Sequence, residues 1–428
     1  MKRILGILAD DFTGALMVAR YIEEAGIACP VLFDPAAAMP DGRVVVAGLR
    51  TRTVPVQDAL QELARVTDRF IETGFERLAY KACATFDSTS EGNIGPAADY
   101  LSDRLSLRPA LMSAGFPQFG TTVHQGYLFY RGRLVTESIK RHDPLTPMPD
   151  PDLVRFLSQQ TPRPIGLVDH ATLVKGRAAA EAALIRHARD GAGHVFFDMT
   201  DDADVEMAAR LAADRPCVVV ASDPLIIRYA QNLAEAAGDT ALARAKPPAA
   251  AAQAVLVGST GPVAMRQVDA FAAHHPVLRL DLLAVPPIET ILRWAEEHVG
   301  TRPFAISTAA DADAVEKVQD RLGALGAARR AEELLGDVAR ALHHKGIRRF
   351  VVSGGETSGA VVTALGIGSV RIVSGGPAGL SFCVSDGPDP VGLCLKPGKL
   401  GTDDILLQAI APGKTGEAQE ICTASGQA

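Results

Sequence analysis

Short apolar segments alternate with longer amphipathic segments along almost the whole chain. In its first half, strands are predicted at 4–9, 43–48, 77–81, 164–168, 194–198 and 217–221, and helices at 13–25, 56–73, 176–190, 203–213 and 224–237. The strand segments are continuously apolar and rich in Val and Ile. Strands of this kind, joined by helices, predict a parallel sheet that is covered on both faces.

The alternation breaks at residues 239–253. Pro247-Pro248 cannot continue a helix there, and the Ala-rich residues beside them show no amphipathic pattern. The alternation of strands and helices then resumes. Strands are predicted at 254–258, 276–280, 303–307, 349–353 and 370–374. Helices are predicted at 262–274, 286–298, 309–323 and 327–344. We therefore predict an α/β protein of two lobes, each a mostly parallel sheet flanked by helices: an N-terminal domain (1–238), a linker (239–253) and a C-terminal domain (254–428).

Composition narrows the class of protein. The 428 residues include 43 Lys and Arg against 50 Asp and Glu, a formal charge of −7, without a long basic run, which disfavours nucleic-acid binding. Apolar stretches stay below the roughly 18–20 residues that a membrane helix needs. The first apolar run stops at Asp10-Asp11, too early for a signal peptide, and the six cysteines lack zinc or disulfide spacing. These features predict a cytoplasmic protein.

Polar side chains follow two of the first strands, where ligands bind in parallel sheets. Asp10 and Asp11 follow the first strand, with Thr13 placed to cap the next helix. The two carboxylates suit a metal, substrate hydroxyls or general-base chemistry; alternatively Asp11 only caps the helix and Asp10 is solvated. Arg52 follows the second strand and suits a bidentate carboxylate contact, although a plain surface role fits equally.

A third polar loop begins at Lys81, at the end of a strand, and continues through Asp87, Ser88 and Thr89. One cation, one carboxylate and several hydroxyls in a single loop suit a small polyhydroxy acid. The alternative is a polar loop whose Ser and Thr cap a helix near Gly95. We favour the binding role.

The second lobe carries glycine-rich turns after its strands. One turn contains Gly354, Gly355, Glu356 and Thr357, and similar turns occur at 258–261 and 374–379. Glycines between a strand and a helix expose backbone N–H groups at the helix N-terminus, which suits phosphate; tight turns without a ligand are the alternative. The Gly413-Lys414 pair lacks the first glycine of a P-loop. The first lobe suits a polyhydroxy acid and the second suits a phosphate group, and together they predict an enzyme that transfers a phosphoryl group.

Five stretches carry a resemblance to a known family: ADDFTGA at 9–15, KACATFDSTSEGNIG at 81–95, TVHQGYLF at 122–129, SGGETSGAVVTALGI at 353–367 and LKPGKLGTDD at 395–404. In this order they resemble the four-carbon acid sugar kinase family over nearly the whole chain. Within it the chain looks most like the 3-oxo-tetronate 4-kinases, with D-threonate and D-erythronate kinases as neighbouring branches.

The resemblance implies ATP-dependent phosphorylation of the C4 hydroxyl of a four-carbon sugar acid. By resemblance, ATP contacts fall on Ser259, Gly354, Gly355, Glu356, Thr357, Gly398 and Gly401. The acid would contact Arg52, Lys81, Ser88 and Thr89, while Asp10, Asp11 or Asp87 would orient or deprotonate the hydroxyl. Mg²⁺ is expected on the phosphates without a direct protein ligand, with Glu356 acting through water. A homodimer is one arrangement to test.

The chain departs from the family pattern near the acid site. Leu16-Met17 stand where a small residue and an acid are usual, Thr121 replaces an Arg, and His124 replaces an aromatic residue. We expect these changes to affect which sugar acid fits. Two other functions remain open: an isomerase or aldolase with Lys81 as a Schiff base, and a sugar-acid binding protein without catalysis.

Overall fold

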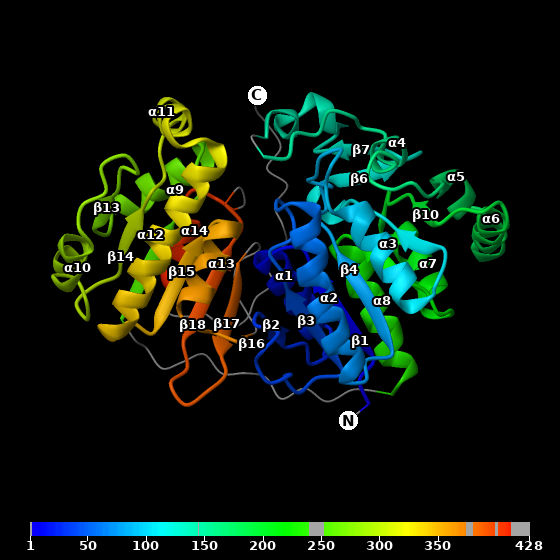
Figure 1. Cartoon of the computed structure of the whole chain (residues 1–428), viewed down its shortest axis with the longest axis horizontal. Coiled ribbons are helices and arrows are strands. Elements are labelled where there is room, and N and C mark those ends of the chain that lie inside the picture. The colour runs from blue at the N-terminus through cyan, green and yellow to red at the C-terminus, as the bar shows by residue number, and fades with distance from the viewer. Residues whose placement is uncertain (1, 144, 239–251, 374–379, 399–400, 412–428) are drawn as a thin grey trace. The chain divides into compact units, whose positions relative to one another are not determined.

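The computed structural model describes residues 2–143, 145–238, 252–373, 380–398 and 401–411. The chain divides into two compact units, Met1–Leu242 and Ala243–Ala428. Each unit is a helix-flanked sheet, which confirms the predicted α/β class (Figure 1). Most of the predicted linker lies outside the described residues, and its last residue, Gln253, already belongs to a strand.

Unit 1 contains an eight-stranded sheet in which every neighbouring pair is parallel. Its strands are β1 (Leu5–Ala9), β2 (Val31–Leu32), β3 (Val44–Gly48), β4 (Arg77–Lys81), β5 (Ala110–Met112), β9 (Ile165–Val168), β10 (His194–Phe197) and β11 (Val219–Ala221). Their order across the sheet is β2-β3-β1-β4-β11-β5-β10-β9. The sequence pattern predicted six of these strands. It missed β2 and β5, which are too short to show a pattern.

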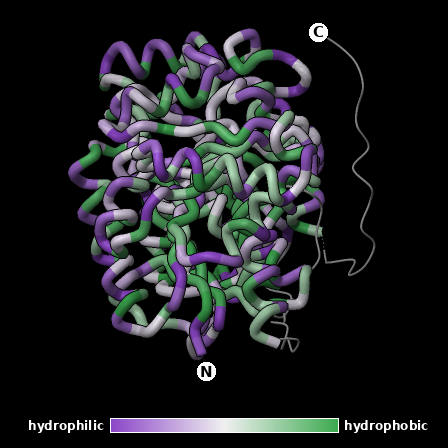
Figure 2. The backbone as a smooth tube through the Cα atoms, turned by 90° about the vertical axis from the view of Figure 1, so that its right-hand side faces the viewer, coloured by the Kyte–Doolittle hydropathy of each residue, from purple (hydrophilic) through white to green (hydrophobic). Residues whose placement is uncertain are grey.

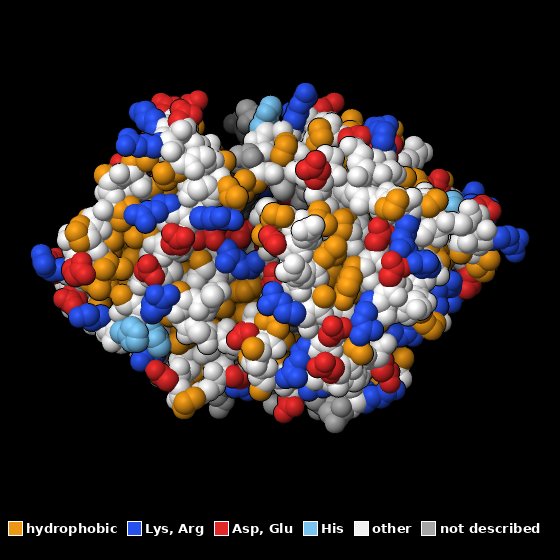
Figure 3. Space-filling view, in the orientation of Figure 1, with side chains coloured by type: hydrophobic (Ala, Val, Ile, Leu, Met, Phe, Trp, Pro, Cys, Tyr) orange, Lys and Arg blue, Asp and Glu red, His pale blue; other side chains and the backbone are white. Residues whose placement is uncertain are grey.

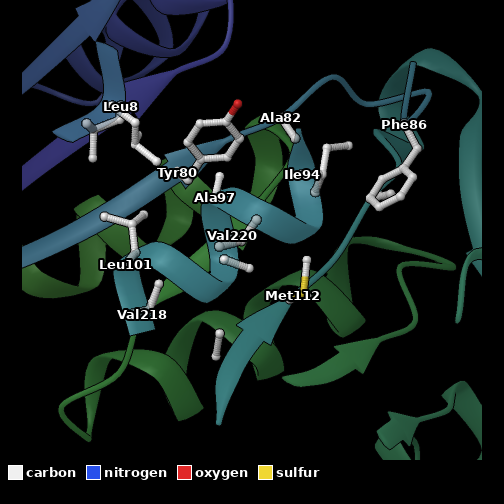
Figure 4. Packing of buried hydrophobic residues seen from close by; sticks show 14 of the residues in the cluster. Leu8, Tyr80, Ala82, Phe86, Ile94, Ala97, Leu101, Met112, Val218 and Val220 are labelled. Carbon is white, nitrogen blue, oxygen red and sulfur yellow. The ribbon is translucent and has the colours of Figure 1, made fainter. Parts of the chain in front are cut away.

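Helices cover both faces of this sheet, as the apolar strands require. They are α1 (Phe12–Glu24), α2 (Val56–Glu72), α3 (Ile94–Leu105), α4 (Leu153–Leu157), α5 (His170–Leu173), α6 (Arg177–Arg189), α7 (Asp202–Ala213) and α8 (Asp223–Ala236). Helices α2 and α3 bury their apolar sides against the sheet, where Tyr80 of β4 packs near Ala97 and Leu101 of α3 (Figure 4). Helix α1 packs beside α8.

A small antiparallel sheet interrupts the alternation in unit 1. It consists of β6 (Thr121–His124), β7 (Tyr127–Tyr130) and β8 (Arg133–Leu134), and two 3₁₀ turns follow, η2 (Val135–Glu137) and η3 (Ile139–His142). We call residues 121–142 the hairpin arm. The alternation of apolar and amphipathic segments did not predict it, because its strands are short and only partly buried.

Unit 2 contains a seven-stranded sheet with one antiparallel part. Its strands are β12 (Gln253–Val257), β13 (Val277–Arg279), β14 (Phe304–Ser307), β15 (Arg349–Ser353), β16 (Ser369–Ile372), β17 (Ser381–Ser385) and β18 (Gly392–Lys396). Their order is β13-β14-β12-β15-β18-β17-β16, parallel up to β18, whereas β17 runs antiparallel to both its neighbours. The sequence reading missed β17 and β18. The glycine turn predicted at 374–379 lies outside the described residues.

The helices of unit 2 are α9 (Pro262–Ala272), α10 (Ile288–Glu296), α11 (Ala312–Leu322), α12 (Ala324–His344), α13 (Gly355–Ala364) and α14 (Ile405–Ile410). Helices α9 and α14 share one apolar cluster with β12, while α12 packs against α13. Seen from the side of unit 1, the backbone has its hydrophobic stretches mainly towards the middle and its hydrophilic ones mainly at the periphery (Figure 2).

Candidate active site

Four strand ends of unit 1 meet at one edge of its sheet. Ala9 of β1 lies opposite Gly48 of β3 and Lys81 of β4, and Lys81 lies opposite Ala221 of β11. The residues that follow these strands are therefore neighbours. This edge gathers charged side chains that lie up to about two hundred positions apart in the chain, as expected for the carboxyl ends of parallel strands.

Arg52 joins the two carboxylates that follow β1. Its Nε and Nη2 donate to the two Asp10 oxygens at 2.8 and 2.9 Å, and Nη2 lies 2.9 Å from Oδ1 of Asp11. Asp10 is buried rather than solvated. Burial works to raise the pKa of Asp11, but Arg52 and Lys81 hold that pKa below its usual value.

The cap of α1 differs from the sequence prediction. The helix begins at Phe12, so Asp11 is its N-cap, and Oδ1 accepts a hydrogen bond from the Gly14 N–H at 2.9 Å. Thr13 does not cap the helix. Its hydroxyl donates to the other Asp11 oxygen at 2.6 Å. Asp11 thus caps the helix and also lies in the charged cluster, so the two roles considered from the sequence are compatible.

Lys81 is buried beside two carboxylates. Its Nζ lies 3.8 Å from Oδ1 of Asp10 and 3.6 Å from Oδ2 of Asp223, both beyond hydrogen-bonding distance. Burial alone would lower the pKa of Lys81, yet Asp223, Asp10 and Asp11 raise it above the ordinary value, so the amine is protonated. Because a Schiff-base lysine must be neutral to attack a carbonyl, this environment disfavours the aldolase alternative.

Asp223 was not among the residues predicted from the sequence. It is the first residue of α8, directly after β11, and only 3% of it is exposed. Burial raises the pKa of Asp223, and Lys81 offsets part of that rise. The signal available in the sequence was its position after an apolar strand, the same signal that selected Asp10 and Lys81.

Asp87 pairs with a lysine that sequence reasoning also missed. Nζ of Lys140, from η3 in the hairpin arm, lies 2.8 Å from each Asp87 oxygen, and the Thr85 hydroxyl donates to the same carboxylate at 2.7 Å. Burial opposes ionisation, but Lys140 and Arg52 lower the pKa of Asp87 to about 2. Asp87 is therefore ionised at neutral pH and has both oxygens occupied.

The remaining predicted residues of this loop are held by Gln160. Its side-chain amide donates to the Ser88 hydroxyl at 2.9 Å and to the Thr89 carbonyl at 2.6 Å. Further along the loop, the Asn93 amide donates to the carbonyl of Thr51, next to Arg52, at 2.5 Å. The Gln160 bonds hold the loop after β4 against the segment that follows α4, and the Asn93 bond holds it against the loop after β3.

In unit 2, glycines lie closely against two hydroxyl groups, those of Ser259 and Thr357. A Cβ at Gly354 would lie 2.9 Å from the Ser259 Oγ, and one at Gly398 would lie 2.1 Å from it. A Cβ at Gly258 would lie 2.0 Å from Oγ1 of Thr357. The Ser259 Oγ is buried without a hydrogen-bond partner among the described residues. A hydroxyl donor beside closely packed glycines at the start of α13 fits a phosphate group.

Lys396 ends β18, two residues before Gly398. It is fully buried, and its Nζ donates to the carbonyls of Pro397 at 2.7 Å and Gly398 at 3.2 Å. Burial lowers the pKa of Lys396 to about 8. The lysine thus shapes the turn that carries Gly398. The sequence reading had not singled it out, because it had not recognised β18.

The other predicted nucleotide residues lie in the same part of unit 2. Gly355 and Glu356 form the first turn of α13, and Gly401, with φ +93°, lies against Ile405 of α14. Within the described ranges, His, Cys, Asp and Glu side chains form no group of three or more that could hold a metal ion.

Unit 2 also has an open groove of about 640 Å³ between α10 and α12. Apolar side chains such as Ile288 and Leu334 line it together with charged ones such as Arg330 and Asp337. Figure 3 shows hydrophobic side chains beside charged ones on this part of unit 2. Its lining includes none of the residues predicted to bind ATP.

Comparison with known proteins assigns a class to each unit. Residues 5–229 match the sugar-binding N-terminal domain family, and residues 254–406 match the nucleotide-binding C-terminal domain family. The pair of domains is that of a sugar kinase. Within the described part of the chain, no helix combines the length and apolar character needed to cross a membrane.

Relatives over the full length narrow the class. The 3-oxo-tetronate kinase of Methylobacterium radiotolerans is 36% identical to this chain, and the match covers 96% of this chain and 99% of that protein. The 3-oxo-tetronate kinase of Pseudomonas fluorescens is 35% identical, and the match covers 97% of this chain and 99% of that protein. A solved structure from Salmonella typhimurium LT2 has a TM-score of 0.81 at 32% identity, covering 95% of this chain and 98% of that one. The chain belongs to the four-carbon acid sugar kinase family, as its motifs predicted.

Proposed function

We propose that this kinase transfers the γ-phosphoryl group of ATP to the C4 hydroxyl of a four-carbon sugar acid, with 3-oxo-tetronate as the preferred acid. The proposal that unit 2 binds ATP rests on the buried Ser259 hydroxyl, which lies beside Gly354 and Gly398. The names of the full-length relatives support the choice of acid. D-Threonate and D-erythronate are the alternative acids within the family.

The nucleotide would lie on the turns of unit 2. The backbone N–H of Gly355 and the hydroxyls of Ser259 and Thr357 would hold its phosphates, and Gly354, Gly398 and Gly401 would let the phosphates approach the backbone closely. ATP supplies the phosphoryl group. Mg²⁺ would neutralise the phosphate oxygens, with Glu356 near it through water.

The acid would lie at the charged edge of unit 1. Arg52 and Lys81 supply positive charge for an anionic substrate, and the hydroxyls of Ser88 and Thr89 supply further polar contacts. Asp10, Asp11 and Asp87 are the catalytic carboxylates proposed to orient the substrate's hydroxyl groups. Because each of these acids already contacts a cation, their geometry is set before the substrate binds, which favours positioning as the main catalytic effect.

The test is ADP release by the full chain with Mg-ATP and a panel of 3-oxo-tetronate, D-threonate, D-erythronate and L-threonate. A kcat/KM for 3-oxo-tetronate at least tenfold above the others supports the proposal. Preference for another acid moves the chain to another branch of the family. Absence of turnover with every acid, together with absence of ATP binding, would contradict the kinase assignment.

A further inference from the structure

Lys81 and Asp223 form an incompletely satisfied pair inside the charged edge of unit 1. The Lys81 Nζ lies 3.6 Å from Oδ2 of Asp223, a charge contact longer than a hydrogen bond. The other oxygen, Oδ1, is buried and has no hydrogen-bond partner among the described residues. Buried carboxylate oxygens are normally hydrogen-bonded, so this one indicates a missing donor.

The local sequence explains why α8 leaves Oδ1 of Asp223 without a donor, although the Asp223 backbone N–H interacts with its own carboxylate. An acid in the first turn of a helix usually accepts a backbone N–H or interacts with the helix dipole. Here Pro224 follows directly and has no N–H to donate. The N-cap Ser222 is also occupied, because its hydroxyl donates to the Gly115 carbonyl at 2.6 Å.

The other carboxylates of the cluster are already occupied. Both Asp10 oxygens accept from Arg52, and both Asp11 oxygens accept hydrogen bonds within the α1 cap. Both Asp87 oxygens contact Lys140. Among the described residues, Asp223 is thus the acid of this cluster with an oxygen that accepts no hydrogen bond.

A donor and an acceptor side by side select the chemistry of the ligand. The Lys81 ammonium can donate, and Oδ1 of Asp223 can accept. A carboxylate could take the lysine's hydrogen bond but would be repelled by Asp223. A hydroxyl group satisfies both, because its oxygen accepts from Lys81 while its proton is donated to Asp223.

Resting on the proposed kinase function, we propose that Lys81 and Asp223 bind the acceptor hydroxyl of the sugar acid and that Asp223 takes its proton. The O–H bond breaks as the hydroxyl oxygen bonds to the γ-phosphorus, the bond from that phosphorus to the bridging oxygen breaks, and ADP leaves. The proton moves to Oδ1 of Asp223, and Lys81 stabilises charge on the attacking oxygen. This leaves Arg52 as the cation for the substrate carboxylate.

Two properties of the pair agree with this role. Burial shields both groups from bulk water, because only 4% of each side chain is accessible. The pKa of Asp223 is raised, whereas those of Asp11 and Asp87 are lowered, and a proton acceptor works best with a pKa nearer the working pH. The titratable and charged groups that face Asp223 are Lys81 of β4, Asp10 after β1, and Asp11 and Tyr21 of the α1 segment.

The first experiment measures the kinetics of Asp223→Asn in the full chain with the best acid of the panel. We expect kcat to fall at least about 100-fold, KM for ATP to stay within about threefold, and the acidic limb of the kcat profile to disappear. Asp202→Asn is the control, because Asp202 is likewise the first residue of a helix but is exposed. A kcat for Asp223→Asn within threefold of wild type overturns the proposal.

A binding experiment separates hydroxyl recognition from folding and from catalysis. Calorimetry compares the same acid with its 4-deoxy analogue in the wild type and in Asp223→Ala. We expect the wild type to favour the hydroxyl form at least about tenfold, and this preference to vanish in the variant. A preserved preference contradicts the assignment. Failure of the kinase function itself would look different, because the wild type would then phosphorylate none of the acids.

Discussion

At the level of single residues, Asp11 links helix capping to the charged cluster. Asp11→Asn keeps an acceptor for the Gly14 N–H but removes the negative charge that faces Arg52 and Lys81. Since Asn caps helices as well as Asp does, we expect unfolding free energy to change by no more than about 1 kcal/mol. We expect kcat to fall at least about tenfold while ATP affinity is unchanged. Steady-state kinetics and a urea titration measure both, and a kcat within a few-fold of wild type would exclude Asp11 from catalysis.

Gly398 is a second residue whose role can be isolated. The Cβ of Gly398→Ala would lie 2.1 Å from the Ser259 Oγ, so either the hydroxyl or the turn must move. We expect ATP affinity to fall at least about tenfold, measured by calorimetry with a non-hydrolysable analogue. The control is Gly326→Ala in α12, where the added Cβ makes only an ordinary contact at 3.5 Å. An equal ATP affinity in both variants would argue against a phosphate site at Ser259.

Lys396 gives a pH dependence of stability with a definite sign. Burial lowers its pKa to about 8 in the folded protein, against 10.5 as its ordinary value. Between these values the unfolded chain binds more protons than the folded one, so this lysine makes the protein more stable as pH rises. We expect wild type to gain stability relative to Lys396→Met between pH 8 and pH 10, measured by urea unfolding. Lys345→Met, at an exposed lysine, should show no such trend.

At the level of elements, the regular part of the fold was predictable and the exceptions were not. The alternation predicts β4 and β15 at their observed bounds, because long apolar runs between helices have few other structures available. It missed β18, which supplies Lys396, and the hairpin arm, which supplies Lys140. Long-range pairing forms these elements, and a local pattern does not report such pairing.

The same limit explains how much of the site was predictable. Asp10 and Arg52 follow predicted strands and Lys81 ends one, so the rule for strand ends located them. Asp223, the partner of Lys81, and Lys140, the partner of Asp87, come from other segments, and no spacing in the sequence connects them to the site. Sequence reasoning therefore identified many residues of the candidate site but not the contacts between them. In particular, it did not predict which acids form ion pairs with Arg or Lys side chains.

The hairpin arm provides a prediction about a whole element. Lys140 connects η3 to Asp87, so Lys140→Met leaves a buried carboxylate without its main cation. We expect hydrogen exchange to accelerate at residues 135–142 and KM for the acid to rise at least about fivefold. Arg133→Met is the control, since Arg133 lies in the same arm but is exposed. Unchanged exchange in Lys140→Met would show that the ion pair does not hold the arm.

At the level of the whole molecule, the division into two units predicts that each ligand protects its own unit. The candidate acid site is built from Met1–Leu242 and the candidate phosphate site from Ala243–Ala428. With ADP alone, we expect slower amide exchange in peptides covering 258–261, 353–358 and 396–401. With the acid alone, peptides covering 9–16, 81–90 and 222–226 should slow instead, because bound ligand suppresses local opening at its own site. Equal protection of 9–16 by ADP alone would place nucleotide contacts in unit 1 and contradict the assignment of one substrate to each unit.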